Sequence, residues 1–298
     1  MKTTRIFPLL LALLALPTLR AEEKRPVLAP TNYPLKDFST RLAGSFADIL
    51  YQIPADHDPA FWKPTDEEVA RIQQADLIIM NGATYEKWAV TTSLPYEGLV
   101  DTSLGFVDRY LETPGAIVHS HGNQGTHSHG GTAYITWLDF SLARQQALAI
   151  HDALLNTFPQ KEKAVKAAFA QLEQDLQTLD QTTREALADF QGQALLASHP
   201  HYQYWSRAYG VEVHALLWEA GMTIDEKAVA DFEALRAQHP AARIFLWDTA
   251  PSEANAAFIR KQGLINVVFS PCATPPAEGD FLSVMKDNLQ RLQKALTE

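Results

Sequence analysis

One long stretch, from Gln160 to Phe190, limits the folds open to this chain of 298 residues. It contains no glycine or proline and is dense in alanine, leucine, glutamine, lysine and glutamate, which favour helix interiors. Its apolar residues fall at helical spacing, at Val165, Ala168, Phe169, Leu172, Leu176 and Leu179. Pro159 stands near the start and Gly192 just beyond the end, as at many helix boundaries. The stretch predicts one long, stiff helix.

Short apolar runs alternate with helical patterns on both sides of this helix, which is typical of βα units and a mainly parallel sheet. The expected strands are 26–29, 49–53, 77–81 and 99–102 before it, and 194–198, 211–217, 243–247 and 267–269 after it. We therefore expect an N-terminal α/β lobe (22–158), a linking helix (159–191) and a C-terminal α/β lobe (192–298). One continuous α/β domain is the alternative.

The first 21 residues have the pattern of a secretory signal peptide. Lys2 and Arg5 precede an apolar run from Ile6 to Leu16, and a short stretch then ends at Ala21. The run is about 11 residues long, whereas a helix needs roughly 20 to cross a bilayer. We expect an exported protein that is free in the periplasm.

Charge and cysteine content narrow the classes of partner. The formal net charge is −10, and loss of three positive leader residues would leave about −13. Nucleic acid and anionic membranes are poor partners for such a chain, and a cation is a better one. The single cysteine, Cys272, cannot form an intramolecular disulfide and is interpreted as a small buried residue.

A histidine-rich loop (119–131) is the strongest indication of chemistry. It holds four of the ten histidines among glycines: His119, His121, His127 and His129. Neutral imidazole suits zinc, copper, nickel and iron, and glycines let the backbone follow the coordination geometry. The loop predicts metal binding, although clustered histidines can also form a weak metal sponge or a solvated polar loop.

A second group of candidates follows the expected strands, where open α/β sheets place their ligands. His199 follows the strand at 194–198, and His201 is a weaker candidate because two residues further on it can point the other way. Glu219 and Asp248 follow later strands, and either can bind metal or orient a ligating imidazole. His57 follows the strand at 49–53.

Several motifs together resemble the zinc and manganese binding proteins of ABC importers, the ZnuA/TroA-like group. In chain order they are Asp58-Pro59 with Trp62-Lys63-Pro64-Thr65, the run from Ala75 to Gly82, the histidine-rich loop, Trp137-Leu138-Asp139, Ser198-His199 and Tyr209-Gly210. The resemblance implies two Rossmann-like lobes, a rigid linking helix, a metal in the cleft between the lobes, and delivery to a membrane permease.

The ligand positions implied by the resemblance are mostly changed here. Ala60 and Ile135 stand where histidines are expected, and Ser270 stands where an acidic residue is frequent. His199 alone stands at an expected position, whereas a specific site for a transition ion usually needs three or four protein ligands. We therefore expect a rebuilt site in which loop histidines join His199, with support from Glu219 or Asp248. His57 could instead restore the first ligand.

The sequence thus predicts a monomeric periplasmic binding protein that carries a divalent transition metal, zinc before others, to the permease of an ABC importer. It has no His-Glu-x-x-His helix, Gly-x-Ser-x-Gly elbow or phosphate-binding glycine loop, so we expect no enzyme. Two alternatives stay open. One is a metal-dependent hydrolase, and the other is a binding protein of the same fold for a different solute.

Overall fold

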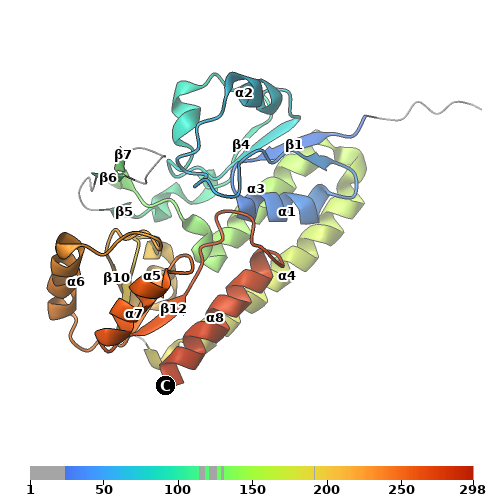
Figure 1. Cartoon of the computed structure of the whole chain (residues 1–298). Coiled ribbons are helices and arrows are strands. Elements are labelled where there is room, and N and C mark those ends of the chain that lie inside the picture. The colour runs from blue at the N-terminus through green and yellow to red at the C-terminus, as the bar shows by residue number, and fades with distance from the viewer. Residues whose placement is uncertain (1–23, 114–117, 121–125, 129–130, 191, 298) are drawn as a thin grey trace, which may run out of the picture.

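The computed structural model describes residues 24–113, 118–120, 126–128, 131–190 and 192–297, and the proposed signal peptide lies outside these ranges. Two α/β lobes lie on one side of a long diagonal helix, α4 (Figure 1). Each lobe has a four-stranded parallel sheet, with order β2-β1-β3-β4 in the first and β10-β9-β11-β12 in the second. The predicted fold class is confirmed.

The strands of the two sheets are β1 (Val27–Pro30), β2 (Asp48–Ile49), β3 (Leu77–Met80), β4 (Leu99–Asp101), β9 (Ala194–Ala197), β10 (Glu212–Ala215), β11 (Ile244–Trp247) and β12 (Ile265–Val268). All eight overlap the strands expected from sequence. The largest difference is β2, expected over 49–53, which has two residues. It is an edge strand that pairs with β1, and Pro54 soon follows with no backbone N–H to donate.

The α-helices are α1 (Tyr33–Ala43), α2 (Asp66–Ile72), α3 (Phe140–Thr157), α4 (Glu162–Ala186), α5 (Gln203–Tyr209), α6 (Glu226–Gln238), α7 (Glu253–Lys261) and α8 (Phe281–Thr297). The 3-10 helices are η1 (Lys87–Thr91), η2 (Leu104–Arg109), η4 (Thr136–Leu138), η5 (Pro159–Lys161) and η6 (Ala188–Phe190). The long helix α4 with its flanking turns η5 and η6 fills the stretch predicted as a linking helix. Within the described residues, no helix is long and apolar enough to span a membrane.

The two lobes share one hydrophobic core. Its largest cluster joins Ile79 of the first sheet, Leu176 of α4, Leu246 of the second sheet and Phe281 of α8. Helix α8 returns along α4 and packs against α1 of the first lobe (Figure 1). The linking helix is therefore packed against both lobes and is not an isolated connector.

Two short antiparallel ladders lie in and at the base of the histidine-rich loop. One joins β5 (Glu112–Thr113) to β8 (Gly131–Thr132), and the other joins β6 (Val118–Ser120) to β7 (Thr126–Ser128). In the second ladder His119 lies opposite His127, so the two backbones bearing these residues are paired. His121 and His129 lie outside the described residues.

Candidate metal centre

The order of strands in the second sheet brings three candidate residues together. His199 follows β9, Glu219 follows β10 and Asp248 follows β11, and β9 lies between the other two strands. Because these strands are parallel, their carboxyl ends lie at one edge of the sheet. All three side chains line one cavity of about 350 Å³ between the lobes.

The side chains at this edge form two imidazole–carboxylate pairs. Nδ1 of His199 lies 3.9 Å from Oε1 of Glu219. Nδ1 of His201 lies 3.6 Å from Oδ2 of Asp248. Both distances exceed the range of a hydrogen bond but keep each imidazole within close electrostatic reach of a carboxylate. The edge therefore offers nitrogen and oxygen donors from four neighbouring side chains.

His201, the weaker candidate in the sequence, lines the same cavity as His199. The expectation that it could face away assumed an extended backbone, in which residues alternate between faces. The chain instead turns at Pro200, where the N–H of His201 donates to the carbonyl of His199 at 2.9 Å. This three-residue turn places the two rings 4.6 Å apart. A proline between the two histidines was the available signal.

The opposite wall of the cavity comes from the N-terminal lobe and includes His57, Asp58 and Ile135. Nδ1 of His57 lies 3.0 Å from the neighbouring carboxylate of Asp56, and its side chain is 45 % exposed. Asp58 accepts a hydrogen bond from the N–H of Ala60, which is fully buried. This wall therefore places one imidazole, that of His57, at the cavity, where it contacts the adjacent carboxylate of Asp56.

A buried amide fixes the segment that carries Ile135. Nδ2 of Asn81 donates to the carbonyl of Tyr134 at 3.0 Å, and Oδ1 of Asn81 accepts from Oγ1 of Thr136 at 3.4 Å. The residues on both sides of Ile135 are thus held, Tyr134 by its carbonyl and Thr136 by its hydroxyl, and the isoleucine lines the cavity. The frame that would position a ligand is present, while the side chain on it has no donor atom.

The cavity is electrostatically suited to a cation. Burial, followed by the nearby charge of Glu219, raises the pKa of Asp248 from 3.8 to about 6. A carboxylate in this environment gains from a cation that neutralises it. A cation bound beside Asp248 would offset both causes of the raised pKa, namely the lost hydration of the carboxylate and its repulsion by Glu219.

The thiol of Cys272 also lines the cavity but belongs to a different electrostatic environment. Burial and the charges of Asp37 and Asp280 raise its pKa to about 12. At neutral pH the group is a buried thiol and not a thiolate, which is the form that binds metal. The interpretation of Cys272 as a small buried residue agrees with this environment.

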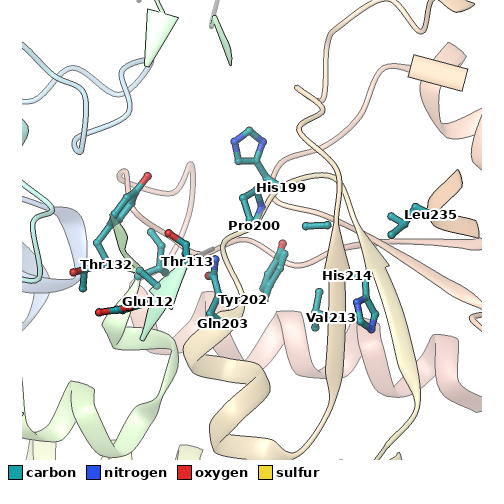
Figure 2. Close-up of a pocket in the computed structure, with 14 residues that line it drawn as sticks. Glu112, Thr113, Thr132, His199, Pro200, Tyr202, Gln203, Val213, His214 and Leu235 are labelled. Carbon is teal, nitrogen blue, oxygen red and sulfur yellow. The ribbon is translucent and has the colours of Figure 1, made fainter. Parts of the chain in front are cut away.

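A second cavity, of about 360 Å³, adjoins the first and shares Ile135 and His199 with it. Figure 2 shows Glu112, Thr113 and Thr132 on one side of it and Val213 and His214 on the other. Glu112, Thr113 and Thr132 belong to β5 and β8, at the base of the histidine-rich loop. The loop therefore starts beside the metal-site candidates, as the sequence-based hypothesis requires.

The donors are near one another but do not yet surround a point. Across the described ranges, no three His, Cys, Asp or Glu side chains stand in an arrangement that could hold a metal ion. Binding would thus require side-chain rotation, the approach of residues outside those ranges, or both. The predicted roles of His57, His199, Glu219, Asp248 and the loop histidines stay predictions.

Comparison with known proteins agrees with this fold. The profile of the family described as "Zinc-uptake complex component A periplasmic" matches residues 28–295. The zinc-binding lipoprotein AdcA of Streptococcus pneumoniae is 23% identical over 280 residues, which are 90% of this chain and 55% of AdcA. The high-affinity zinc uptake system protein ZnuA of Bacillus subtilis is 22% identical over 286 residues, which are 89% of this chain and 86% of that protein.

Solved structures show the same architecture. Zn(II)-bound AdcA from Streptococcus pneumoniae superposes with a TM-score of 0.78 and 21% identity, covering 92% of this chain and 58% of AdcA. The periplasmic zinc binding protein TroA from Treponema pallidum gives 0.74 and 18%, covering 92% and 99%. This chain thus spans little more than half of AdcA and nearly all of TroA.

The family match extends over both sheets and the linking helix, so it confirms the resemblance seen in the motifs. It also supports the prediction that this chain is not an enzyme, because the family is described as a component of a zinc-uptake complex. The chain belongs to the periplasmic zinc-uptake component A family.

Proposed function

We propose that this protein captures a divalent transition metal, zinc before others, in the cavity between its lobes and delivers it to the permease of an ABC importer. The observation that carries the proposal is the convergence of His199, Glu219 and Asp248 at the carboxyl edge of one sheet. Imidazole with carboxylate is a donor set that zinc accepts. Two relatives, AdcA and ZnuA, are named for zinc binding and zinc uptake.

The acidic balance of the chain favours the same cargo. A formal charge of −10 attracts divalent cations over a range set by the ionic strength. Histidine donors disfavour manganese, which prefers more oxygen ligands. Zinc is therefore the metal to test first, and nickel, copper and cobalt should be tested as competitors.

His199 is the central ligand in this proposal because it lines both cavities and is almost fully buried. Three groups are candidates to complete the site. They are the histidine-rich loop, which starts beside the second cavity, His57 on the opposite wall, and His201 with its carboxylate partner.

Elemental analysis of untagged protein tests the proposal. We expect about one equivalent of zinc after incubation with excess metal and desalting, and loss of that equivalent in His199→Ala. His214→Ala is the matched control. His214 also belongs to the C-terminal lobe, but it lines only the second cavity and not the one that holds Glu219 and Asp248. A wild-type protein that retains no divalent transition metal would refute the proposal and favour a different solute.

Deletion of residues 119–131 separates cargo binding from the role of the loop. If the deleted protein keeps one equivalent, the loop does not supply essential ligands and the transport function stands. If it loses the metal while its unfolding temperature is unchanged, the loop histidines are ligands.

A further inference from the structure

We infer that Tyr204, a side chain of the C-terminal lobe, is a positioning residue that fixes the base of the histidine-rich loop beside the proposed metal site. The inference rests on the proposed function and deepens it, because it names the contact through which both lobes together place the loop. The contact joins the ladder β5–β8, which belongs to the N-terminal lobe, to helix α5, which belongs to the C-terminal lobe.

The hydroxyl of Tyr204 takes the place of one backbone hydrogen bond at the base of the loop. Glu112 lies opposite Thr132 in the ladder, so Leu111 and Ala133 form the next pair. Such an antiparallel pair can exchange two N–H···O bonds. The N–H of Ala133 donates directly to the carbonyl of Leu111 at 2.7 Å. The N–H of Leu111 donates to the Tyr204 hydroxyl at 3.2 Å, and this hydroxyl donates to the carbonyl of Ala133 at 2.9 Å.

The Tyr204 side chain is buried among residues of the N-terminal lobe. It is fully buried and belongs to one hydrophobic cluster with Phe106, Ala133 and Leu142. A buried hydroxyl is costly unless it is hydrogen-bonded, and this one both accepts and donates. Burial raises the pKa of the Tyr204 phenol, so the group stays protonated and able to donate at neutral pH. The hydroxyl is therefore a lasting connection between the two strands.

Neighbouring side chains hold α5 to its own lobe. Tyr202, just before the helix begins, donates its hydroxyl to the carbonyl of Phe269 at 2.8 Å. Trp205 packs against the same Phe269 with ring centroids 5.1 Å apart. Tyr204 stands between these two residues in the chain and contacts the other lobe. Because His201 directly precedes Tyr202, the helix fixes the base of the loop relative to the histidine turn of the candidate site.

The ladder held by Tyr204 lies at the same cavity as His199. Thr113 of β5, Thr132 of β8 and His199 all line the second cavity (Figure 2). Thr113 pairs with Gly131, so the ladder holds both ends of the segment 114–130, which carries all four loop histidines. Fixed ends leave fewer conformations to be lost when loop side chains bind a metal, and this favours binding.

A second contact keeps α5 in place when the Tyr204 hydroxyl is removed. Nη1 of Arg207 donates to the carbonyl of Arg109 in the N-terminal lobe at 2.5 Å. The Arg207 guanidinium also lies 5.1 Å from the centre of the Tyr204 ring. Tyr204→Phe keeps the ring, its buried cluster and these Arg207 contacts. It therefore changes the base of the loop without undocking the helix.

Competition titrations of zinc against a chromophoric chelator test the inference on the full mature chain. Tyr204→Phe should weaken zinc binding about 10- to 100-fold, the usual loss when a group that orients metal ligands is removed. Tyr209→Phe is the matched control on the same helix. The Tyr209 hydroxyl donates to Asp180 of α4 at 2.8 Å and accepts from the N–H of Phe140, so it is not part of the ladder. This variant should bind zinc as the wild type does.

A chain without loop imidazoles separates positioning from a merely structural role. In it glutamine replaces His119, His121, His127 and His129. Adding Tyr204→Phe to this chain should change its zinc affinity by less than about twofold, because no loop donor is left to position. If the glutamine chain binds no zinc, the loop histidines are the ligands, and a loss in Tyr204→Phe with none in Tyr209→Phe supports the inference.

Hydrogen exchange of the metal-free protein tests the contact without zinc. The peptide that contains Leu111 should exchange faster in Tyr204→Phe than in the wild type or Tyr209→Phe. Peptides of β9 and β11 should be unchanged, which shows that the variant is folded. Unchanged exchange at Leu111 overturns the inference.

The outcomes separate the two proposals. A wild type that binds no zinc overturns the proposed function and, with it, the role of Tyr204 in zinc binding. A wild type that binds zinc overturns the inference alone if Tyr204→Phe binds equally well. Equal losses from Tyr204→Phe with and without the loop histidines also overturn the inference alone, because the effect then does not act through the loop.

Discussion

Replacement of Asp248 by asparagine should stabilise the metal-free protein while it weakens the metal complex. The side chain is 17 % exposed, and burial followed by the charge of Glu219 raises its pKa from 3.8 to about 6. When folding raises the pKa of an acid, the protonated acid stabilises the folded state relative to the ionised acid. Its stabilising contribution is complete below about pH 3.8 and is lost as the pH rises through about 6. At pH 7.5 the ionised carboxylate therefore opposes folding.

The magnitude follows from the shift. About two pKa units at 1.36 kcal/mol each correspond to about 3 kcal/mol at pH 7.5, and to about 1 kcal/mol at pH 4.5, where the folded carboxyl is mostly protonated. Asparagine has nearly the same shape and no charge, so Asp248→Asn should recover much of this free energy. For a chain of this size the gain corresponds to about 6–12 °C in the unfolding temperature.

Thermal unfolding with and without zinc measures both effects. Without metal at pH 7.5 the variant should unfold at a higher temperature than the wild type, and the difference should shrink at pH 4.5. With excess zinc the variant should gain about 2.7 kcal/mol less than the wild type, if its affinity falls 100-fold. The reasoning is refuted if Asp248→Asn lowers the metal-free unfolding temperature, or if zinc stabilises both proteins equally.

Three further predictions concern the same cavity and its frame. Ile135→His places an imidazole on the segment fixed by Asn81 and should tighten zinc binding by about an order of magnitude, measured by competition titration; unchanged affinity would show that the ion lies too far from this wall. Asp139→Ala should cost about 2–4 kcal/mol in urea unfolding without changing zinc stoichiometry, because Asp139 caps α3 and accepts from Arg109 and Arg207. Zinc affinity should fall between pH 7.5 and 5.5, as Asp248 protonates through about pH 6 and protonated imidazoles cease to ligate, and a flat titration profile would contradict a site of this composition.

The fold could be predicted because its elements are locally marked. The apolar runs that became β3 and β11 are bounded by polar or turn residues, and the stretch around α4 has neither glycine nor proline. The ends of strands at the edge of a sheet were less predictable. Strand β2 ends at Ile49 although its partner β1 continues to Pro30 and the N–H of Leu50 still donates to the carbonyl of Leu28, so the apolar run from 49 to 53 does not by itself mark the end of the strand.

The candidate site was only half predictable, because the order of strands is a long-range property. The sequence placed Glu219 and Asp248 after separate strands, but it could not show that β9 lies between β10 and β11. That order makes the two carboxylates flank the histidines. Likewise, the hairpin register that pairs His119 with His127 depends on turn geometry that histidine content does not specify.

The residues on the N-terminal and C-terminal walls of the cavity are best considered together. A site with ligands on both lobes couples metal binding to the distance between the lobes. Here the N-terminal wall keeps the amide frame of Asn81 but carries Ile135, whereas the C-terminal edge carries His201 and Asp248 beside His199. Loss of donors on one lobe would leave the ion under-coordinated unless donors accumulated on the other, because three or four protein ligands are usual for specific sites. The second sheet offers candidate donors at three neighbouring strand ends, and His57 and Asp58 lie on the N-terminal wall, so we expect residues of both walls to set affinity and selectivity.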